Sequence, residues 1–240
     1  MPEITIELIR RRAEHNEGFI HTLEELSLHQ EELESINYTL GCNCRRLKIL
    51  YLQNNIIGEM QNLHHMKELE YLNLALNNIS KVQGLHACEF LNKLDLTVNF
   101  VDLDELESSV DAMRGNLHLK DLYMMGNPCQ AWEGFEPYVM ARLPQLERLD
   151  GKEITRTNRI RAQQRLPSLR EELDPLADEV RQRKRQDAKA GDKKGGAKAL
   201  KPAGASGIED GEDGEDIIDG DYKGNYDFTA QHKDGQHSRE

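Results

Sequence analysis

Long apolar runs are missing from this chain of 240 residues. No segment approaches the roughly 18 consecutive apolar residues of a transmembrane helix, so no membrane span and no membrane partner are expected. Residues 1–12 carry charges throughout and lack the apolar centre of a signal peptide. Only four cysteines are present, without disulfide-like spacing, which indicates reduced thiols and a cytoplasmic location.

Positive charge is also scarce, because 31 Lys and Arg residues stand against 43 Asp and Glu residues, for a net charge of −12. Nucleic acid is therefore not expected as a partner, since phosphate binding needs clustered cations. Leu and Ile nearly vanish beyond Gly191, where Gly, Lys, Asp and Glu take over. Such a segment cannot offset a chain entropy of about 1–2 kcal/mol per residue, which predicts a disordered charged tail over 191–240.

A repeated pattern, Leu-x-x-Leu-x-Leu-x-x-Asn, fills the middle of the chain. Complete or near-complete copies begin at Leu23, Leu47, Leu69, Leu91 and Leu119, and a partial copy begins at Leu146. The three central copies are 22 residues apart (69 − 47 and 91 − 69), and the next follows after 28 (119 − 91). This is the leucine-rich-repeat signature. It predicts an α/β fold, a solenoid with a parallel β-sheet on its concave face.

Each copy predicts a short strand with inward leucines, a bend, and a return segment. An asparagine amide at each bend can satisfy backbone groups, so stacked copies predict a structural ladder. Its members are Asn55, Asn77, Asn99 and Asn127, with Asp150 at the cap. The return segments of the 22-residue copies predict 3₁₀ or single-turn helix with Leu63, Leu85 and Leu106 as inward anchors, and the 28-residue copy has room for an α-helix.

The ends of the repeat array need caps that cover its last leucines. Residues 1–22 predict an N-terminal capping helix, with Ile6, Ile9 and Ala13 on one face. Residues 23–154 contain the repeats and a C-terminal cap, whose helix presents Phe135 and Tyr138. Residues 155–190 predict a helical segment interrupted at two prolines, before the charged tail.

The strand residues between the leucines predict the concave surface. The candidate protein-binding residues on this surface are Ile49, Tyr51, Gln53, Tyr71, Asn73, Lys93, Asp95, Asp121, Tyr123 and Met125. Three tyrosines in the central column form a semi-polar aromatic patch of a kind enriched at protein interfaces. The alternative is that tyrosines are strand formers tolerated on a half-exposed sheet. Leu76 and Val98, just before two ladder asparagines, are apolar where polar residues would serve.

The sequence offers no constellation for catalysis. Cys42 and Cys44 form a C-x-C pair without a second pair at ligand spacing, so neither zinc nor another cofactor is expected. Ser27 and His29 are neighbours on one strand but lack a nucleophile elbow or a group that orients the base. The prediction is a binding protein without enzymatic activity.

Several phrases are more specific than the repeat itself. They are Leu23-Glu-Glu-Leu-Ser-Leu-His29, Leu47-Lys-Ile-Leu-Tyr-Leu-Gln-Asn-Asn55, Leu72-Asn-Leu-Ala-Leu-Asn-Asn78, Leu94-Asp-Leu-Thr-Val-Asn-Phe100, Met125-Gly-Asn-Pro-Cys129 and Leu149-Asp-Gly-Lys-Glu-Ile154. Over about residues 3–160 the chain closely resembles the family of dynein axonemal assembly factor 11, also called leucine-rich-repeat-containing protein 6 or Tilb/Seahorse.

The resemblance implies a non-catalytic scaffold for cytoplasmic preassembly of axonemal dynein arms, needed for cilium and flagellum motility. Implied partners are a MYND-zinc-finger assembly factor, chaperones or co-chaperones, and dynein chains; the cilium, flagellum or basal body are further implied locations. Family members carry a CS-like domain after the repeats, and this chain has no such β-rich segment, which we interpret as truncation or divergence. The alternatives are a regulatory subunit of a protein phosphatase, testable by co-purified phosphatase activity, and a structural axonemal component that binds dynein or tubulin, testable by fractionation.

Overall fold

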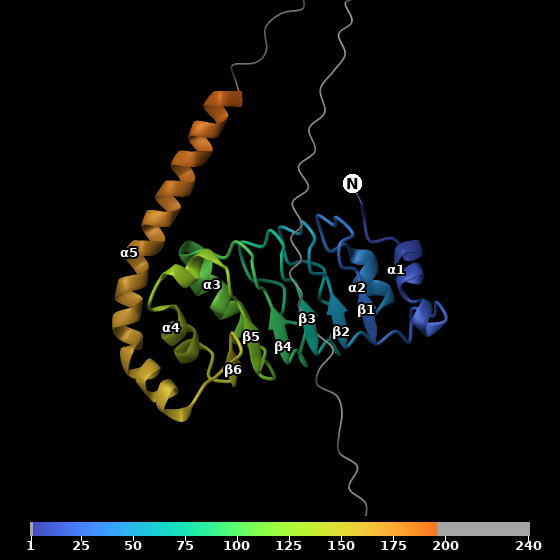
Figure 1. Ribbon diagram of the computed structural model, residues 1–240, viewed down its shortest axis with the longest axis horizontal. Helices are drawn as coiled ribbons and strands as arrows, with labels where there is room; N and C mark the ends of the chain where they lie inside the picture. The colour runs from blue at the N-terminus through green and yellow to red at the C-terminus, as the bar shows by residue number, and fades with distance from the viewer. Residues whose placement is uncertain (1, 196–240) are drawn as a thin grey trace, which may run out of the picture. The chain divides into compact units, whose positions relative to one another are not determined.

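A computed structural model describes residues 2–195, and Figure 1 shows their arrangement as a row of coils with strands along one side. The strands are β1 (Glu25–Ser27), β2 (Ile49–Tyr51), β3 (Tyr71–Asn73), β4 (Lys93–Asp95), β5 (Asp121–Tyr123), β6 (Arg148–Leu149) and β7 (Lys152–Glu153). They form one 7-stranded sheet in chain order. The pairings from β1 to β6 are parallel and only β6 with β7 is antiparallel, so the fold is a leucine-rich-repeat solenoid as predicted.

The middle residue of each strand from β1 to β5 is a leucine that is completely buried. The register aligns Leu26, Leu50, Leu72, Leu94 and Leu122 across the sheet. The flanking strand residues point to the opposite side, because strand side chains alternate. A single apolar core therefore runs along the inside of the coils, from Ile4 to Leu173.

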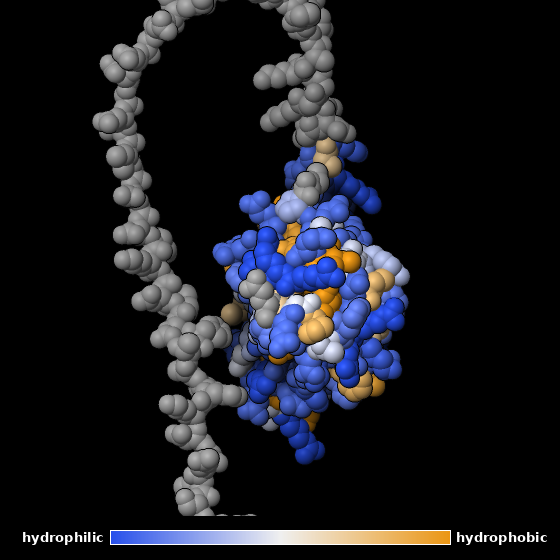
Figure 2. Space-filling model, turned by 90° about the vertical axis from the view of Figure 1, so that its right-hand side faces the viewer, coloured by the Kyte–Doolittle hydropathy of each residue, from blue (hydrophilic) through white to orange (hydrophobic). Residues whose placement is uncertain are grey.

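The N-terminal cap consists of α1 (Ile6–Arg12) and a 3₁₀ turn, η1 (Glu14–Asn16). The hydroxyl of Thr5 accepts a hydrogen bond from the Leu8 N–H and so caps α1. Arg11 and Arg12 form ion pairs with Glu31, which stands at the first ladder position in place of asparagine. This face, shown in Figure 2, is mostly hydrophilic with apolar side chains visible between the charged ones.

The ladder asparagines are buried and bridge consecutive coils. In Asn99, Oδ1 accepts from the Ile79 N–H at 3.0 Å, and Nδ2 donates to the Leu74 carbonyl at 2.9 Å and the Leu96 carbonyl at 3.0 Å. Asn55, Asn77 and Asn127 make the same kinds of bond one coil away. The amides thereby satisfy backbone groups that the bends leave without a partner.

The residue before each ladder asparagine has a positive φ. The values are +57° at Asn54, +56° at Leu76, +53° at Val98 and +76° at Gly126. Asparagine and glycine favour this left-handed conformation, whereas for a branched side chain such as valine it is a strained outlier. Two of the four bends are therefore built at a local cost of order 1 kcal/mol each.

The return segments differ in part from the prediction. Leu63, Leu85 and Leu106 are buried anchors. The 28-residue copy contains α3 (Leu103–Met113), as expected. The prediction of 3₁₀ or single-turn helix in the 22-residue copies is wrong, since residues 57–68 and 79–90 form turns, bends and irregular chain. A short helix, α2 (Tyr38–Asn43), lies instead in the first copy, which is two residues longer (47 − 23 is 24).

The C-terminal cap is formed by a 3₁₀ turn, η2 (Pro128–Ala131), by α4 (Phe135–Arg142) and by the β6–β7 hairpin. Tyr138 is fully buried, and Arg142, also buried, donates hydrogen bonds to its hydroxyl and to carboxylates of Glu107 and Asp111 on α3. These bonds hold α4 against α3.

A long helix, α5 (Arg156–Gly195), follows the cap and lies against α3 and α4 (Figure 1). Leu169 and Leu173 are buried on this contact. The prediction of a helix interrupted at Pro167 and Pro175 is wrong, because both prolines lie inside one helix. The helix also continues past the predicted boundary at 190, and the rest of the predicted tail lies outside the described residues. No helix within residues 2–195 is long and apolar enough to cross a membrane.

Candidate functional binding face

The sheet register arranges the outward strand residues in two rows. The first contains Glu25, Ile49, Tyr71, Lys93, Asp121 and Arg148, and the second contains Ser27, Tyr51, Asn73, Asp95 and Tyr123. The expectation of one central column of tyrosines is therefore wrong. Tyr71 begins its strand, whereas Tyr51 and Tyr123 end theirs, so the three rings follow a zigzag across both rows.

The tyrosine rings nevertheless form one cluster with a lysine. Tyr51 and Tyr71 meet edge to face, with ring centroids 5.6 Å apart. The Lys93 ammonium lies 4.4 Å from the centroid of Tyr71 and 5.1 Å from that of Tyr123. These are cation–π contacts, and Lys93 forms no ion pair within the described part of the chain. A cation held between two aromatic rings on an open sheet is a preorganised binding feature.

The electrostatics of this tyrosine–lysine cluster follow from partial burial. Burial raises the pKa of Tyr71 well above its ordinary value, and nearby Asp95 raises it further. The pKa of Tyr51 is raised by burial and then by Glu25, and that of Tyr123 by burial and then by Asp121. All three hydroxyls therefore stay neutral at physiological pH and remain hydrogen-bond donors and acceptors.

The remaining predicted residues support the cluster in different ways. Asp121 is buried and forms two 2.6 Å hydrogen bonds with the Arg148 guanidinium on β6. Asn73 and Asp95 accept from backbone N–H groups two residues ahead, which fixes the bends after β3 and β4. The Gln53 Oε1 atom is buried without a hydrogen-bond partner among residues 2–195.

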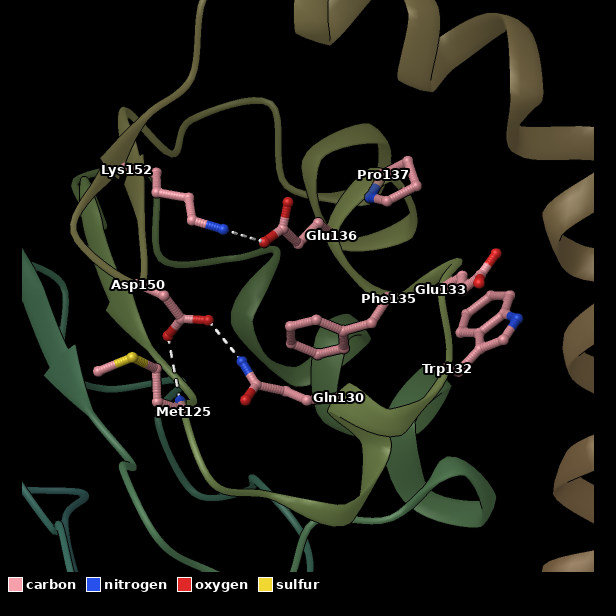
Figure 3. A pocket seen from close by; sticks show the side chains of 9 residues that line it. All are labelled: Met125, Gln130, Trp132, Glu133, Phe135, Glu136, Pro137, Asp150 and Lys152. Carbon is pink, nitrogen blue, oxygen red and sulfur yellow. Dashed lines mark hydrogen bonds and ion pairs between the residues drawn. The ribbon is translucent and has the colours of Figure 1, made fainter.

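A hollow of about 420 Å³ opens where the last full coil meets the C-terminal cap (Figure 3). Its lining residues are Met125, Gln130, Trp132, Glu133, Phe135, Glu136, Pro137, Asp150 and Lys152. Lys152 and Glu136 pair across it at 2.7 Å. The Trp132 ring lies against Gly134, where an added Cβ would be only 2.1 Å from the ring, so a side chain at that position would displace the indole.

Asp150 closes the ladder from inside this hollow. Its Oδ1 accepts from the N–H groups of Met124 at 2.6 Å and Met125 at 3.1 Å, and its Oδ2 accepts from the Gln130 amide at 2.6 Å (Figure 3). Burial raises the pKa of this carboxyl, and the two backbone N–H groups oppose the rise without cancelling it.

The raised pKa of Asp150 predicts a particular pH dependence of stability. The protonated form is favoured in the folded state, so its contribution is fully present below the ordinary pKa of 3.8 and is lost as the pH rises through the folded-state value. The urea-unfolding midpoint of the wild-type protein should therefore fall relative to that of Asp150→Asn as the pH rises across that window. Parallel curves for the two proteins would contradict this assignment.

Among the described residues, this face carries groups that can bind a ligand, and no catalytic or metal-binding arrangement of side chains is found there. The Ser27 Oγ and His29 Nδ1 atoms are 2.7 Å apart, but the hydrogen bonds of the described residues include no carboxylate on the other ring nitrogen. Within residues 2–195 no group of three His, Cys, Asp or Glu side chains is placed to hold a metal ion. Burial raises the pKa of the Cys44, Cys88 and Cys129 thiols to about 12, which removes their nucleophilic thiolate forms.

Eight of the ten predicted concave residues lie in the strands, and Gln53 and Met125 follow two residues after β2 and β5; Met125 is exposed at the rim of the hollow. The sequence prediction missed Trp132 as part of a pocket and Arg148 as the partner of Asp121. The spacing of the partial sixth copy aligns Arg148 with Asp121 on the neighbouring strand, and this alignment could have predicted the ion pair.

These observations define a leucine-rich-repeat protein whose sheet face carries a tyrosine–lysine cluster, the candidate binding site. No protein-family model matches the chain. Among solved structures it is similar to the Drosophila melanogaster SNF/U2A′ complex, with a TM-score of 0.59 and 25% identity over 68% of this chain and 92% of that chain.

Two curated relatives specify the family. The chain is 57% identical over 170 residues to Dynein axonemal assembly factor 11 of Danio rerio, a match that covers 71% of this chain and 38% of the relative. It is 60% identical over 169 residues to the Xenopus laevis protein of the same name, covering 70% and 35%. Through its repeat region the chain belongs to the dynein axonemal assembly factor 11 family. It spans little more than a third of the length of these relatives.

Proposed function

We propose that this chain is a non-catalytic scaffold in the cytoplasmic preassembly of axonemal dynein arms, and that its concave face binds a protein component of that process. The observation that carries the proposal is the identity of 57% to 60% with dynein axonemal assembly factors over the repeat region. As partners we propose those that the resemblance implies: a MYND-zinc-finger assembly factor, chaperones and dynein chains.

The tyrosine–lysine cluster supports binding through the concave face. Tyrosine rings bury large areas at low entropic cost and are enriched among interface residues whose truncation weakens binding most. Tyr51 and Tyr71 are fixed by mutual contact, and Lys93 is fixed by two rings, so little ordering is needed when a partner binds.

The test is affinity purification from ciliated cells followed by mass spectrometry. We expect dynein heavy chains and assembly co-factors with the wild-type chain. Tyr71→Ala with Tyr123→Ala should lower the affinity for them by at least about thirtyfold, since one interface anchor alone contributes roughly 2 kcal/mol. Tyr38→Ala is the matched control, because Tyr38 is an exposed tyrosine on α2, away from the strands.

Circular dichroism and melting temperature must show that the double variant is folded. If it is not, Lys93→Glu reverses the charge of the cluster while leaving the rings in place, and should also abolish recovery. Undiminished recovery with either folded variant would contradict the concave face as the site. Absence of dynein components from the wild-type sample would contradict the proposed process.

A further inference from the structure

A second candidate surface lies beside the C-terminal ends of the strands, in the loops that follow them. Five apolar residues there are about half exposed: Ile56 at 46%, Leu76 at 50%, Val98 at 46%, Phe100 at 57% and Met125 at 48%. They come from the loops after β2, β3, β4 and β5. We call this set the apolar ridge.

The loops that carry Leu76, Val98 and Met125 of the apolar ridge are direct neighbours along the solenoid. The Leu76 N–H donates to the Thr97 carbonyl at 2.8 Å, and the Val98 N–H donates to the Met125 carbonyl at 2.7 Å, so these loops lie side by side. A Cβ added to Gly126 would be 3.0 Å from Val98 Cγ2, which places the valine side chain directly against the next loop.

The fold itself does not require these side chains. Asn54 and Gly126 occupy the corresponding bends with residue types suited to a positive φ, whereas Leu76 and Val98 adopt φ values of +56° and +53°. Both are also half exposed, so core packing does not account for them. Two apolar side chains kept in strained backbone and facing solvent indicate a binding surface.

Unpaired carboxylates stand at both ends of the apolar ridge, and Lys152, which lines the hollow at one end, is paired with Glu136. Residues 53–56, 75–78, 97–100 and 125–131 contain no Lys or Arg. At one end Glu32 is exposed beside Leu33, whose carbonyl accepts from the Ile56 N–H at 3.0 Å. At the other end Glu133 is exposed and lines the same hollow as Met125. Neither carboxylate forms an ion pair within residues 2–195.

We propose that the apolar ridge binds one amphipathic helix of a partner protein, with basic residues flanking its apolar stripe. Neighbouring coils are about 4.8 Å apart and a helix rises about 5.4 Å per turn, so successive turns of a helix lying along the solenoid match successive coils. The carboxylates at both ends favour a basic helix. They disfavour this chain's own acidic segment at 209–221 and a second copy, which would present the same carboxylates.

Photo-crosslinking in ciliated cells tests the proposal. A benzoylphenylalanine is placed at Asn78, an exposed position between ridge loops, and the crosslinked peptide is identified by mass spectrometry. We expect a basic amphipathic helical segment, and a yield reduced about tenfold or more by Leu76→Asn with Val98→Asn. This variant introduces the residue found at Asn54, so it should keep or raise the melting temperature. The same probe at exposed His86, in a return segment, should not capture that peptide.

The proposal depends on the proposed function only in taking the chain as a binding protein, and the two are tested separately. Tyr71→Ala with Tyr123→Ala should leave the Asn78 crosslink intact, whereas a loss in this variant would overturn the assignment of a separate surface. Crosslinks to residues 196–240, to a second copy or to an acidic segment would also overturn it. So would no crosslink, or an unchanged yield in the asparagine variant; if that variant is unfolded, Leu76→Gly with Val98→Gly provides the same comparison.

Discussion

Asn77→Ala should destabilise the fold by about 3 kcal/mol, although it removes only one small side chain. Asn77 is 3% exposed. Its Oδ1 accepts from the Ile57 N–H at 3.0 Å, and its Nδ2 donates to the carbonyls of Leu52 at 2.9 Å and Leu74 at 3.1 Å. Removing the amide leaves the buried Ile57 N–H without a partner, and an unsatisfied buried group costs roughly 1–3 kcal/mol. The Leu52 and Leu74 carbonyls each lose one of two hydrogen bonds and keep those from Asn55 and Asn99.

The neighbouring asparagine provides a matched control. Asn78 is exposed, so Asn78→Ala should change stability by less than about 0.5 kcal/mol. Urea unfolding followed by circular dichroism measures both variants under identical conditions. Equal losses at the two positions would show that the ladder does not stabilise the coils in the way described.

Leu169→Ala should lower the free energy of unfolding by about 3 kcal/mol, because α5 is part of the folded unit. The Leu169 side chain is completely buried where α5 packs against α3 and α4. Truncating a buried leucine removes its transfer free energy and leaves a cavity. Ser168→Ala, on the exposed side of the same helix, is the control and should have little effect.

Limited proteolysis shows whether the loss is local. If α5 covers the cap as the structure indicates, Leu169→Ala should expose cleavage sites within 156–180 before the repeats are cut. Unchanged unfolding and unchanged proteolysis would mean that α5 is an independent segment, in agreement with the boundary expected at residue 155.

The features that repeat were readable from the sequence, because each recurs with the same spacing and the same chemistry. The buried leucines and the α-helix of the 28-residue copy follow directly from the period. The rows of the binding face were harder to assign. Tyr71 and Tyr51 differ by two strand positions, which is one row, and this shift moves a ring by several ångströms.

Other features depend on contacts that no short motif encodes. Pro167 and Pro175 ordinarily end a helix, yet α5 continues through both since its apolar stripe is held by α3 and α4. The Trp132 ring that lines the hollow fits there because Gly134 has no side chain. Tertiary packing decides both outcomes, so local preference alone gives the wrong answer for the helix and no answer for the hollow.

The antiparallel hairpin between β6 and β7 sets a limit on what the concave face can hold. Its two-residue turn, Asp150 and Gly151, has positive φ at both positions and reverses the chain, so no further parallel coil can be added at that edge. From β1 to β6 the face is about 24 Å long at about 4.8 Å per strand. If the partner segment proposed for this face is helical and lies along it, about 16 of its residues fit between β1 and β6.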